Sequence, residues 1–163
     1  MKIKSPYHIN IQDVPICIPK PPQQGRGGNV ELRIVYGSDI GIMVGSRSFG
    51  YHSKPHFHDA EQFNYILSGE IWFFIEDEGF LCKSGDILRI PRNKVHWTWC
   101  KHPDGVQFLE AHCPALIGDA DLAAGALSML GSDEDSSKVL TPINEWVQFD
   151  KVMEVERRAG ASD

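Results

Sequence analysis

The chain has 163 residues, of which 42% are hydrophobic and 23% charged, and its formal net charge is −6. This size suits one domain with one core, and the acidic balance argues against a nucleic-acid surface, where a basic stripe is expected. The start of the sequence lacks a long apolar stretch, and its four cysteines form no CxxC pair. These features favour a cytoplasmic protein with free thiols and no membrane anchor.

An N-terminal arm is predicted for residues 1–29, because residues 14–28 are rich in proline and glycine. Strand signals then dominate residues 30–114, where short β-branched and apolar stretches alternate with glycine-containing turns. The expected strands lie within 30–37, 40–50, 85–91, 95–100 and 106–113, and residues 63–81 predict two more, joined at Ser68 and Gly69. Short strands at roughly even spacing are typical of a sandwich or barrel, so we expect an all-β domain over residues 30–114.

A C-terminal extension is predicted for residues 115–163, because the sequence changes character after Pro114. Residues 119–130 are rich in Ala and Leu and predict a short helix. Residues 141–158 predict a second helix, with Thr141 as its N-cap and Pro142 at its first position, although a strand around Trp146 to Phe149 is an alternative. We expect this helical or irregular extension to pack on one end or face of the β domain.

Three histidines have the spacing of metal ligands. His56 and His58 are alternate residues of an expected strand, so both imidazoles project to the same face and could bind one ion. His96 follows a strand, Pro91 and a tight turn, and it is the next candidate. Since chance His-x-His pairs are common, the assignment depends on further donors that face the same space.

The segments around these histidines resemble the two paired motifs of the cupin superfamily. The first family pattern is G-x5-H-x-H-x3,4-E-x6-G, and this chain matches every spacing with Gln in place of Glu. The second is G-x5-P-x-G-x2-H-x3-N, with Asn93 here in place of the middle Gly and Cys100 in place of the final Asn. Asn tolerates the left-handed turn conformation that Gly usually provides. The matching residues are Gly50, His56, His58, Gln62 and Gly69, then Gly85, Pro91 and His96.

The resemblance covers roughly residues 30–114. It implies an all-β fold, a small antiparallel β-barrel of the cupin or jelly-roll kind, with one divalent metal ion inside the barrel. The ion would be Fe, Mn, Zn, Ni or Co, and its implied ligands are His56, His58, Gln62 and His96. The alternative is that these histidines fill the interior of a metal-free cupin. The resemblance also implies a homodimer.

Spacing selects Gln62 over the neighbouring Glu61 as the fourth metal ligand. Counting back six residues from Gly69 and forward three from His58 both give position 62. Strand alternation then predicts that Gln62, Asn64 and Ile66 point inward, since a slip of one residue would turn every side chain to the other face. Four neutral ligands leave a divalent ion its full charge, which favours polarisation of a carbonyl or hydroxyl over oxidative chemistry.

An acid or base must then come from elsewhere in the barrel. Glu110 and His112 share one face of the strand at 106–113 and are the predicted catalytic residues. The alternative is that they pair with each other or with an arginine such as Arg47 or Arg89. Arg47, Asn64 and Thr98 are the predicted substrate-binding residues, and apolar walls are expected from Phe49, Trp72 and Phe74.

These features predict a metal-dependent cupin enzyme that acts non-oxidatively, as a lyase, isomerase or cyclase, on a small oxygenated molecule. Two alternatives remain, a mononuclear iron dioxygenase and a non-catalytic cupin that binds a small ligand. The expected partner is a small-molecule substrate, with neither nucleic acid nor membrane.

Overall fold

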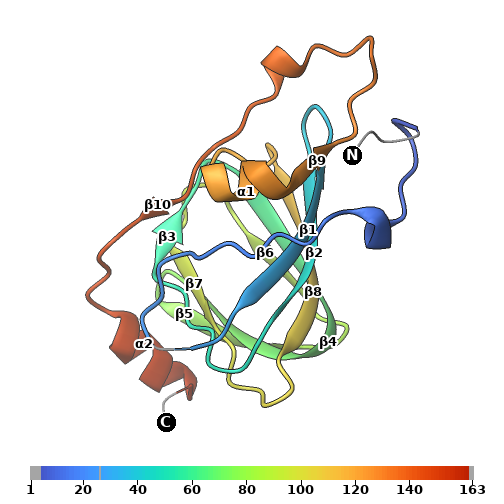
Figure 1. Ribbon diagram of the computed structural model, residues 1–163. Coiled ribbons are helices and arrows are strands. Elements are labelled where there is room, and N and C mark those ends of the chain that lie inside the picture. The colour runs from blue at the N-terminus through green and yellow to red at the C-terminus, as the bar shows by residue number, and fades with distance from the viewer. Residues whose placement is uncertain (1–4, 26, 162–163) are drawn as a thin grey trace.

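The fold is a curled antiparallel sheet, seen in a computed structural model that describes residues 5–25 and 27–161 (Figure 1). Its strands run in the order β10-β3-β7-β4-β8-β2-β1-β9, with β5 and β6 each paired to β4. Of the pairings between these strands, that of β1 with β9 is parallel. The strands are β1 (Val30–Tyr36), β2 (Gly41–Arg47), β3 (His56–Phe57), β4 (Glu61–Ile75), β5 (Glu78–Lys83), β6 (Ile87–Ile90), β7 (His96–Trp99), β8 (Val106–Cys113), β9 (Ala126–Ser128) and β10 (Glu145–Trp146). This confirms the small all-β fold expected from the sequence.

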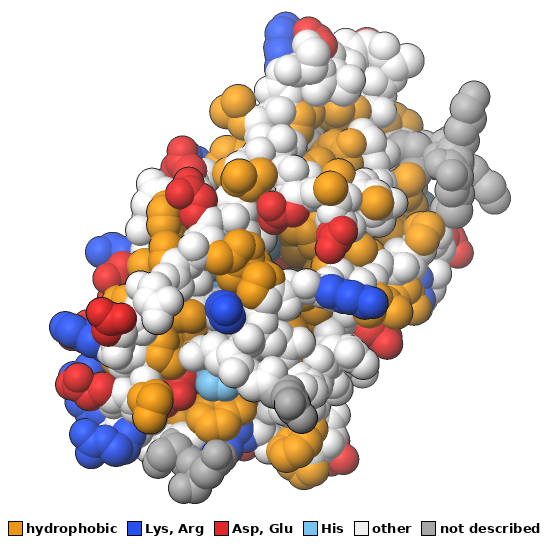
Figure 2. Space-filling view, turned by 60° about the vertical axis from the view of Figure 1, so that its left-hand side comes forward, with side chains coloured by type: hydrophobic (Ala, Val, Ile, Leu, Met, Phe, Trp, Pro, Cys, Tyr) orange, Lys and Arg blue, Asp and Glu red, His pale blue; other side chains and the backbone are white. Residues whose placement is uncertain are grey.

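Four helical elements complete the described residues. They are the 3₁₀ turns η1 (Ile11–Asp13) and η2 (Ser136–Lys138), and the α-helices α1 (Ala120–Gly125) and α2 (Val152–Ala159). No helix of the described residues is long and apolar enough to cross a membrane. On the face that Figure 2 shows, acidic and basic side chains stand among apolar ones. That face therefore carries no continuous basic stripe of the kind that nucleic-acid binding requires.

Strand β4 joins the two halves of the barrel. Its first part pairs with β8 and β6, and its second part with β5 and β7. A register shift between Ile66 and Ser68 and a positive φ of 76° at Gly69 bend the strand between these parts. The prediction of two strands joined at Ser68 and Gly69 is therefore wrong. A bulge followed by glycine lets one continuous strand turn the corner of the barrel, where a junction between two strands was expected.

The inward and outward faces of β4 alternate as the sequence indicated. Gln62, Asn64 and Ile66 are at most 4% exposed, whereas Phe63 and Tyr65 are 43% and 42% exposed. The inward Ile66 belongs to an apolar core with residues from β1, β6 and β8, namely Ile34, Ile90 and Phe108. Because this core fixes the register, the polar side chains at positions 62 and 64 must also face the interior.

The turn between β6 and β7 lies against the loop that carries His58. Asn93 has a φ of 60°, which confirms the expected left-handed conformation at this position. Its backbone N–H donates to the carbonyl oxygen of His58 at 3.0 Å. The turn before His96 and the loop after His56 are thereby held together, which brings the two motifs to one place.

The C-terminal segment departs from the helix predicted over residues 141–158. Helix α2 begins only at Val152, and Glu145 and Trp146 instead form β10, opposite Phe57 and His56 of β3. The alternative of a strand around Trp146 is thus closer to the observed structure, because the backbone at Glu145 and Trp146 is extended and pairs with β3 at the edge of the sheet. Within residues 119–130, the expected short helix is found as α1, and the chain then continues as β9 beside β1.

Candidate metal centre

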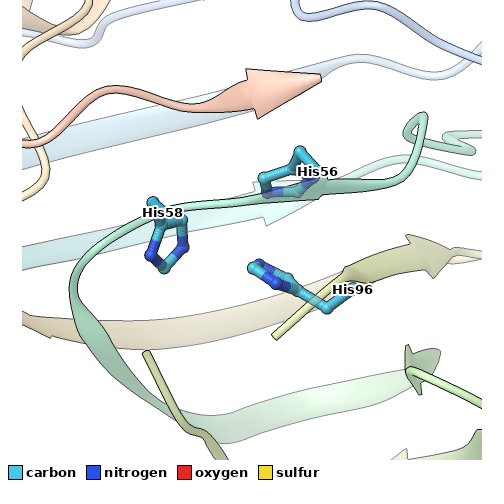
Figure 3. Close-up of side chains that lie close together, drawn as sticks. All are labelled: His56, His58 and His96. Carbon is cyan, nitrogen blue, oxygen red and sulfur yellow. The ribbon is translucent and has the colours of Figure 1, made fainter. Parts of the chain in front are cut away.

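Three imidazoles converge inside the barrel. His56 lies on β3, His58 on the loop that follows, and His96 on β7, directly opposite His56 in the β3–β7 pair. One ring nitrogen from each lies within 4.8 Å of the other two, and Figure 3 shows the three rings facing a common space. His58 and His96 are buried, and His56 is half-buried.

The three rings are oriented by the same kind of backbone hydrogen bond. The Nδ1 atoms of His56, His58 and His96 lie 3.2, 3.0 and 2.9 Å from the carbonyl oxygens of Lys54, Ala60 and Lys94. Each Nδ1–H can donate to its carbonyl, which leaves the lone pair of Nε2 free, and metal-binding histidines are commonly oriented in this way. The tautomer is assigned from these partners.

Burial keeps these imidazoles neutral, the form in which histidine binds metal. Burial lowers the pKa of His56 to about 3 and also lowers that of His58. Burial and the neighbouring His56 lower the pKa of His96 well below its usual value.

The surroundings of His58 fit a cation. Its Nδ1 faces the oxygen of Ala60, and its Nε2 lies 3.2 Å from Oε1 of Gln62. A neutral imidazole has one N–H and can donate to only one of these oxygens, so the other nitrogen presents a lone pair to an oxygen. A metal ion beside His58 and Gln62 would be attracted to both of these electron-rich atoms. The residues present therefore suit the divalent ion that the sequence motifs imply.

Gln62 and Glu61 lie on opposite sides of β4. Gln62 is 4% exposed and reaches His58, while Glu61 is at the rim, where its Oε1 accepts from Nε of Arg89 at 2.5 Å. The structure thus places Gln62 against His58, one of the three histidines, and leaves Glu61 outside. The assignment of Gln62 as a ligand stays a prediction.

Glu110, a predicted catalytic residue, is buried and fully hydrogen-bonded. Its Oε1 accepts from Arg47 at 2.9 Å, and its Oε2 accepts from Gln62 at 2.6 Å and Asn64 at 2.7 Å. Burial alone would raise the pKa of Glu110, but the Arg47 guanidinium, His112 and the hydrogen bonds hold the pKa below its usual value. Glu110 is therefore ionised. It pairs with Arg47, as in the alternative to a catalytic role.

His112, the other predicted catalytic residue, lies opposite Gln62 in the β4–β8 pair, and its ring centroid is 5.6 Å from that of His58. Its Nδ1 is buried and has no hydrogen-bond partner within residues 5–25 and 27–161. Burial lowers the pKa of His112 to about 4, against a smaller opposing effect of Glu110. A neutral imidazole with an unused nitrogen therefore lies close to the three-histidine cluster.

A cavity of about 370 Å³ opens beside the cluster. Its polar wall includes the predicted residues Arg47 and Thr98, together with Ser53, Gln62, Glu110 and His112. Its apolar wall is formed by Val30, Leu32, Met43, Tyr51, Leu116 and Leu122. A cavity of this size, mostly apolar with a few convergent polar groups, is typical of small-molecule sites.

The apolar walls expected from Phe49, Trp72 and Phe74 are a wrong prediction. Phe49 is 61% exposed, and Phe74 stacks on Trp97 in a separate cluster beneath α2. Trp72 packs against that same cluster. The second part of β4 turns Trp72 and Phe74 away from the cavity, and β1 and β2 supply part of the apolar wall in their place.

Trp146 borders the cavity and was missed as a site residue. Its ring centroid lies 4.7 Å from that of His56, because β10 pairs with β3. Pro19–Pro22 and the first turn of α1 also line the cavity. Only the pairing of the C-terminal segment with β3 brings Trp146 here, and the apolar spacing of residues 141–158 suggested a helix instead.

Comparison with known proteins indicates the protein family that this chain resembles. The fold and site define a small β-barrel with a histidine-lined cavity, and the model of the Cupin domain family matches residues 48–112. This match supports the cupin superfamily for the part of the chain that it covers. No curated protein matches the chain.

Solved structures of similar fold have low sequence identity. The polyketide cyclase RemF from Streptomyces resistomycificus is 20% identical with a TM-score of 0.56, over 65% of this chain and 78% of its own. A cupin 2 conserved barrel domain protein from Rhodopseudomonas palustris is 15% identical with a TM-score of 0.53, over 62% and 72%. An RmlC-like cupin from Shewanella frigidimarina is 17% identical with a TM-score of 0.50, over 64% and 86%. At these identities the likeness shows the fold alone.

The buried histidines predict that the metal-free protein loses stability in mild acid. An unfolded histidine has a pKa near 6.5, whereas the pKa values of His56 and His112 are about 3 and about 4 in the fold. Above pH 6.5 both states are neutral, but as the pH falls below it the unfolded chain takes up protons that the fold does not. Each such histidine then costs at most about 1.4 kcal/mol per pH unit.

Urea unfolding of the metal-free protein at pH 7.5 and pH 5 measures this loss. We expect the free energy of unfolding to be lower at pH 5, and the difference to be smaller in His112→Phe. Equal stability of the native chain at both pH values would contradict the neutral, buried state of these rings.

Proposed function

We propose that this chain is a metal-dependent enzyme that acts non-oxidatively on a small oxygenated molecule. The observation that carries the proposal is the set of neutral donors, His56, His58, His96 and Gln62, at the wall of a cavity of about 370 Å³. A divalent ion held by these residues supplies Lewis-acid polarisation of an oxygen-bearing group. The cyclase activity named for RemF belongs to this reaction class, but the proposal rests on the site.

The proposed roles of the other residues follow from their surroundings. His112 is neutral, and its Nδ1 has no partner in the part of the chain that the structure describes, so it can take a proton from the substrate or donate its N–H to a substrate oxygen. Thr98 is 5% exposed and offers a hydroxyl at the cavity wall. Arg47 contributes its charge at the same wall, where its Nε and one terminal nitrogen have no partner among the described residues. Polar substrate atoms would satisfy these groups, and Val30, Leu32 and Met43 would cover an apolar part of the molecule.

The reaction class is tested by proton exchange without oxygen. The Zn²⁺-loaded and Fe²⁺-loaded proteins are incubated anaerobically in D₂O with a panel of hydroxy acids, β-diketones and sugar acids, and NMR follows deuterium incorporation and product formation. We expect turnover of at least one compound without oxygen. Turnover that occurs only with oxygen uptake by the iron form would establish the dioxygenase alternative, and binding without any turnover would establish the ligand-binding one.

His112→Gln is predicted to lower the turnover of such a substrate by about 10²–10⁴-fold, the usual contribution of a positioned acid or base. Metal affinity should be unchanged, because the three-histidine cluster does not include His112. The matched control is His102→Gln, since His102 accepts from the backbone N–H of Asp104 in an exposed turn. Full turnover by His112→Gln with bound metal would remove His112 from the proposed mechanism.

A further inference from the structure

The amide of Gln62 is held at one end by a carboxylate. Strand pairing places Asn64 opposite Glu110 and Gln62 opposite His112, so these four side chains lie on one inner face of β4 and β8. The Gln62 nitrogen donates one hydrogen bond to Oε2 of Glu110 at 2.6 Å and one to Oδ1 of Asn64 at 2.7 Å. Both N–H groups of the amide are therefore used, and its oxygen is the end left for His58.

Glu110 determines which end of the amide faces the histidines. An ionised carboxylate can only accept hydrogen bonds, so the amides of both Gln62 and Asn64 must turn their nitrogens toward it. Asn64 then has its oxygen free to accept the second N–H of Gln62. Without the carboxylate, the Gln62 amide could rotate by 180° and present N–H groups, which cannot bind a metal ion.

The hydrogen bonds to Glu110 also change the charge distribution within the Gln62 amide. Hydrogen bonds in a buried network polarise one another, so a carboxylate that accepts from an amide nitrogen makes the amide oxygen more negative. Arg47 balances the charge of Glu110 from its other side at 2.9 Å. Gln62 is thus a neutral donor that lies between the anion and the three histidines.

We propose that Glu110 is a positioning residue, which with Asn64 fixes the Gln62 amide with its oxygen toward the three histidines and strengthens that oxygen as a metal ligand. The inference rests on the proposed metal site and deepens it. The histidine that binds zinc in many proteins is oriented by a carboxylate in the same manner, and loss of such an outer partner lowers metal affinity by about 10–100-fold.

Zn²⁺ titration calorimetry of four proteins tests this role, namely the native chain, Glu110→Gln, Gln62→Glu and the double variant that exchanges the two residues. In the native background, Glu110→Gln should weaken Zn²⁺ binding by about 10–100-fold. In the Gln62→Glu background, the same substitution should strengthen it, because it replaces two facing carboxylates by a carboxylate and an amide. If the role of Glu110 were purely structural, Glu110→Gln would change the Zn²⁺ affinity in the same direction in both backgrounds, and that result would overturn the inference.

Glu61→Gln is the matched control, because Glu61 is a neighbouring carboxylate that pairs with Arg89 at the rim. Its Zn²⁺ affinity should equal that of the native chain. If the native chain itself binds no Zn²⁺, the proposed function fails, and the inference about metal affinity fails with it. If the native chain binds Zn²⁺ and Glu110→Gln binds it equally well, only the inference fails.

The orientation of the amide can also be measured in the native protein without metal, whether or not Glu110→Gln folds. ¹⁵N-edited NMR should show the Gln62 side-chain NH₂ slow to exchange, with both protons in strong hydrogen bonds and contacts to Asn64. An NH₂ group that exchanges rapidly, or that shows contacts to His58 instead, would overturn the proposed orientation.

Discussion

His96→Ala is expected to abolish metal binding. His96 supplies one of three nitrogen atoms that lie within 4.8 Å of one another, and its Nδ1 is fixed by the carbonyl oxygen of Lys94. Loss of an outer partner of a metal ligand costs about 10–100-fold in affinity, so loss of the ligand itself should cost more than about 100-fold. At a free Zn²⁺ concentration of about 100 times the native Kd, the native protein should gain about 2.7 kcal/mol of stability, and His96→Ala should gain less than about 0.4 kcal/mol.

Thermal unfolding with and without Zn²⁺ measures this difference. The control is His102→Ala, because His102 lies in an exposed turn and contacts the backbone of Asp104. If Zn²⁺ stabilises His96→Ala as much as it stabilises the native chain, zinc binds elsewhere on the protein.

Arg47→Met is expected to destabilise the protein by about 3–5 kcal/mol, the usual cost of removing one partner from a buried ion pair. The side chains of Arg47 and Glu110 are only 11% and 5% exposed, and the guanidinium lies 4.2 Å above the ring of Phe108. The substitution keeps much of the packing but leaves the Glu110 carboxylate without its cation.

The matched substitution is Arg89→Met, which removes the other arginine–glutamate pair that borders β4. The side chains of Arg89 and Glu61 are 57% and 36% exposed, and pairs of this kind contribute about 0–1 kcal/mol. Urea unfolding of both variants at pH 7.5 gives the comparison. Equal losses of unfolding free energy would contradict the conclusion that Glu110 is a buried, ionised group that needs Arg47.

The central part of the site could be predicted from the sequence because its spacing is fixed by strands. The two-residue alternation placed His56 and His58 on one side, and the distance to Gly69 selected Gln62 over Glu61. The same alternation placed Asn64 and Ile66 in the interior, where both are at most 1% exposed. The alternation depends on the local geometry of a strand, whereas the choice of Gln62 rests on the spacing of the cupin motif that the sequence resembles.

The outer part of the site could not be predicted, because it depends on contacts between distant segments. Trp146 reaches His56 only through the pairing of β10 with β3, and its surrounding sequence has the apolar spacing of a helix. The pairing of Glu110 with Arg47 rather than Arg89 depends on the order of strands in the sheet, where β2 lies beside β8. The bulge in β4 likewise turned Trp72 and Phe74 away from the cavity that they were expected to line.

The most direct test of the proposed metal centre is a crystal structure of the Zn²⁺-loaded protein, with the ion located by anomalous scattering at the zinc edge. We predict one ion bound by the Nε2 atoms of His56, His58 and His96 at about 2.0–2.1 Å. The Gln62 oxygen should complete the protein ligands, with Glu110 still bonded to the Gln62 nitrogen. An ion bound by Glu61, or a barrel whose three histidines hold no zinc at saturating concentration, would contradict the account.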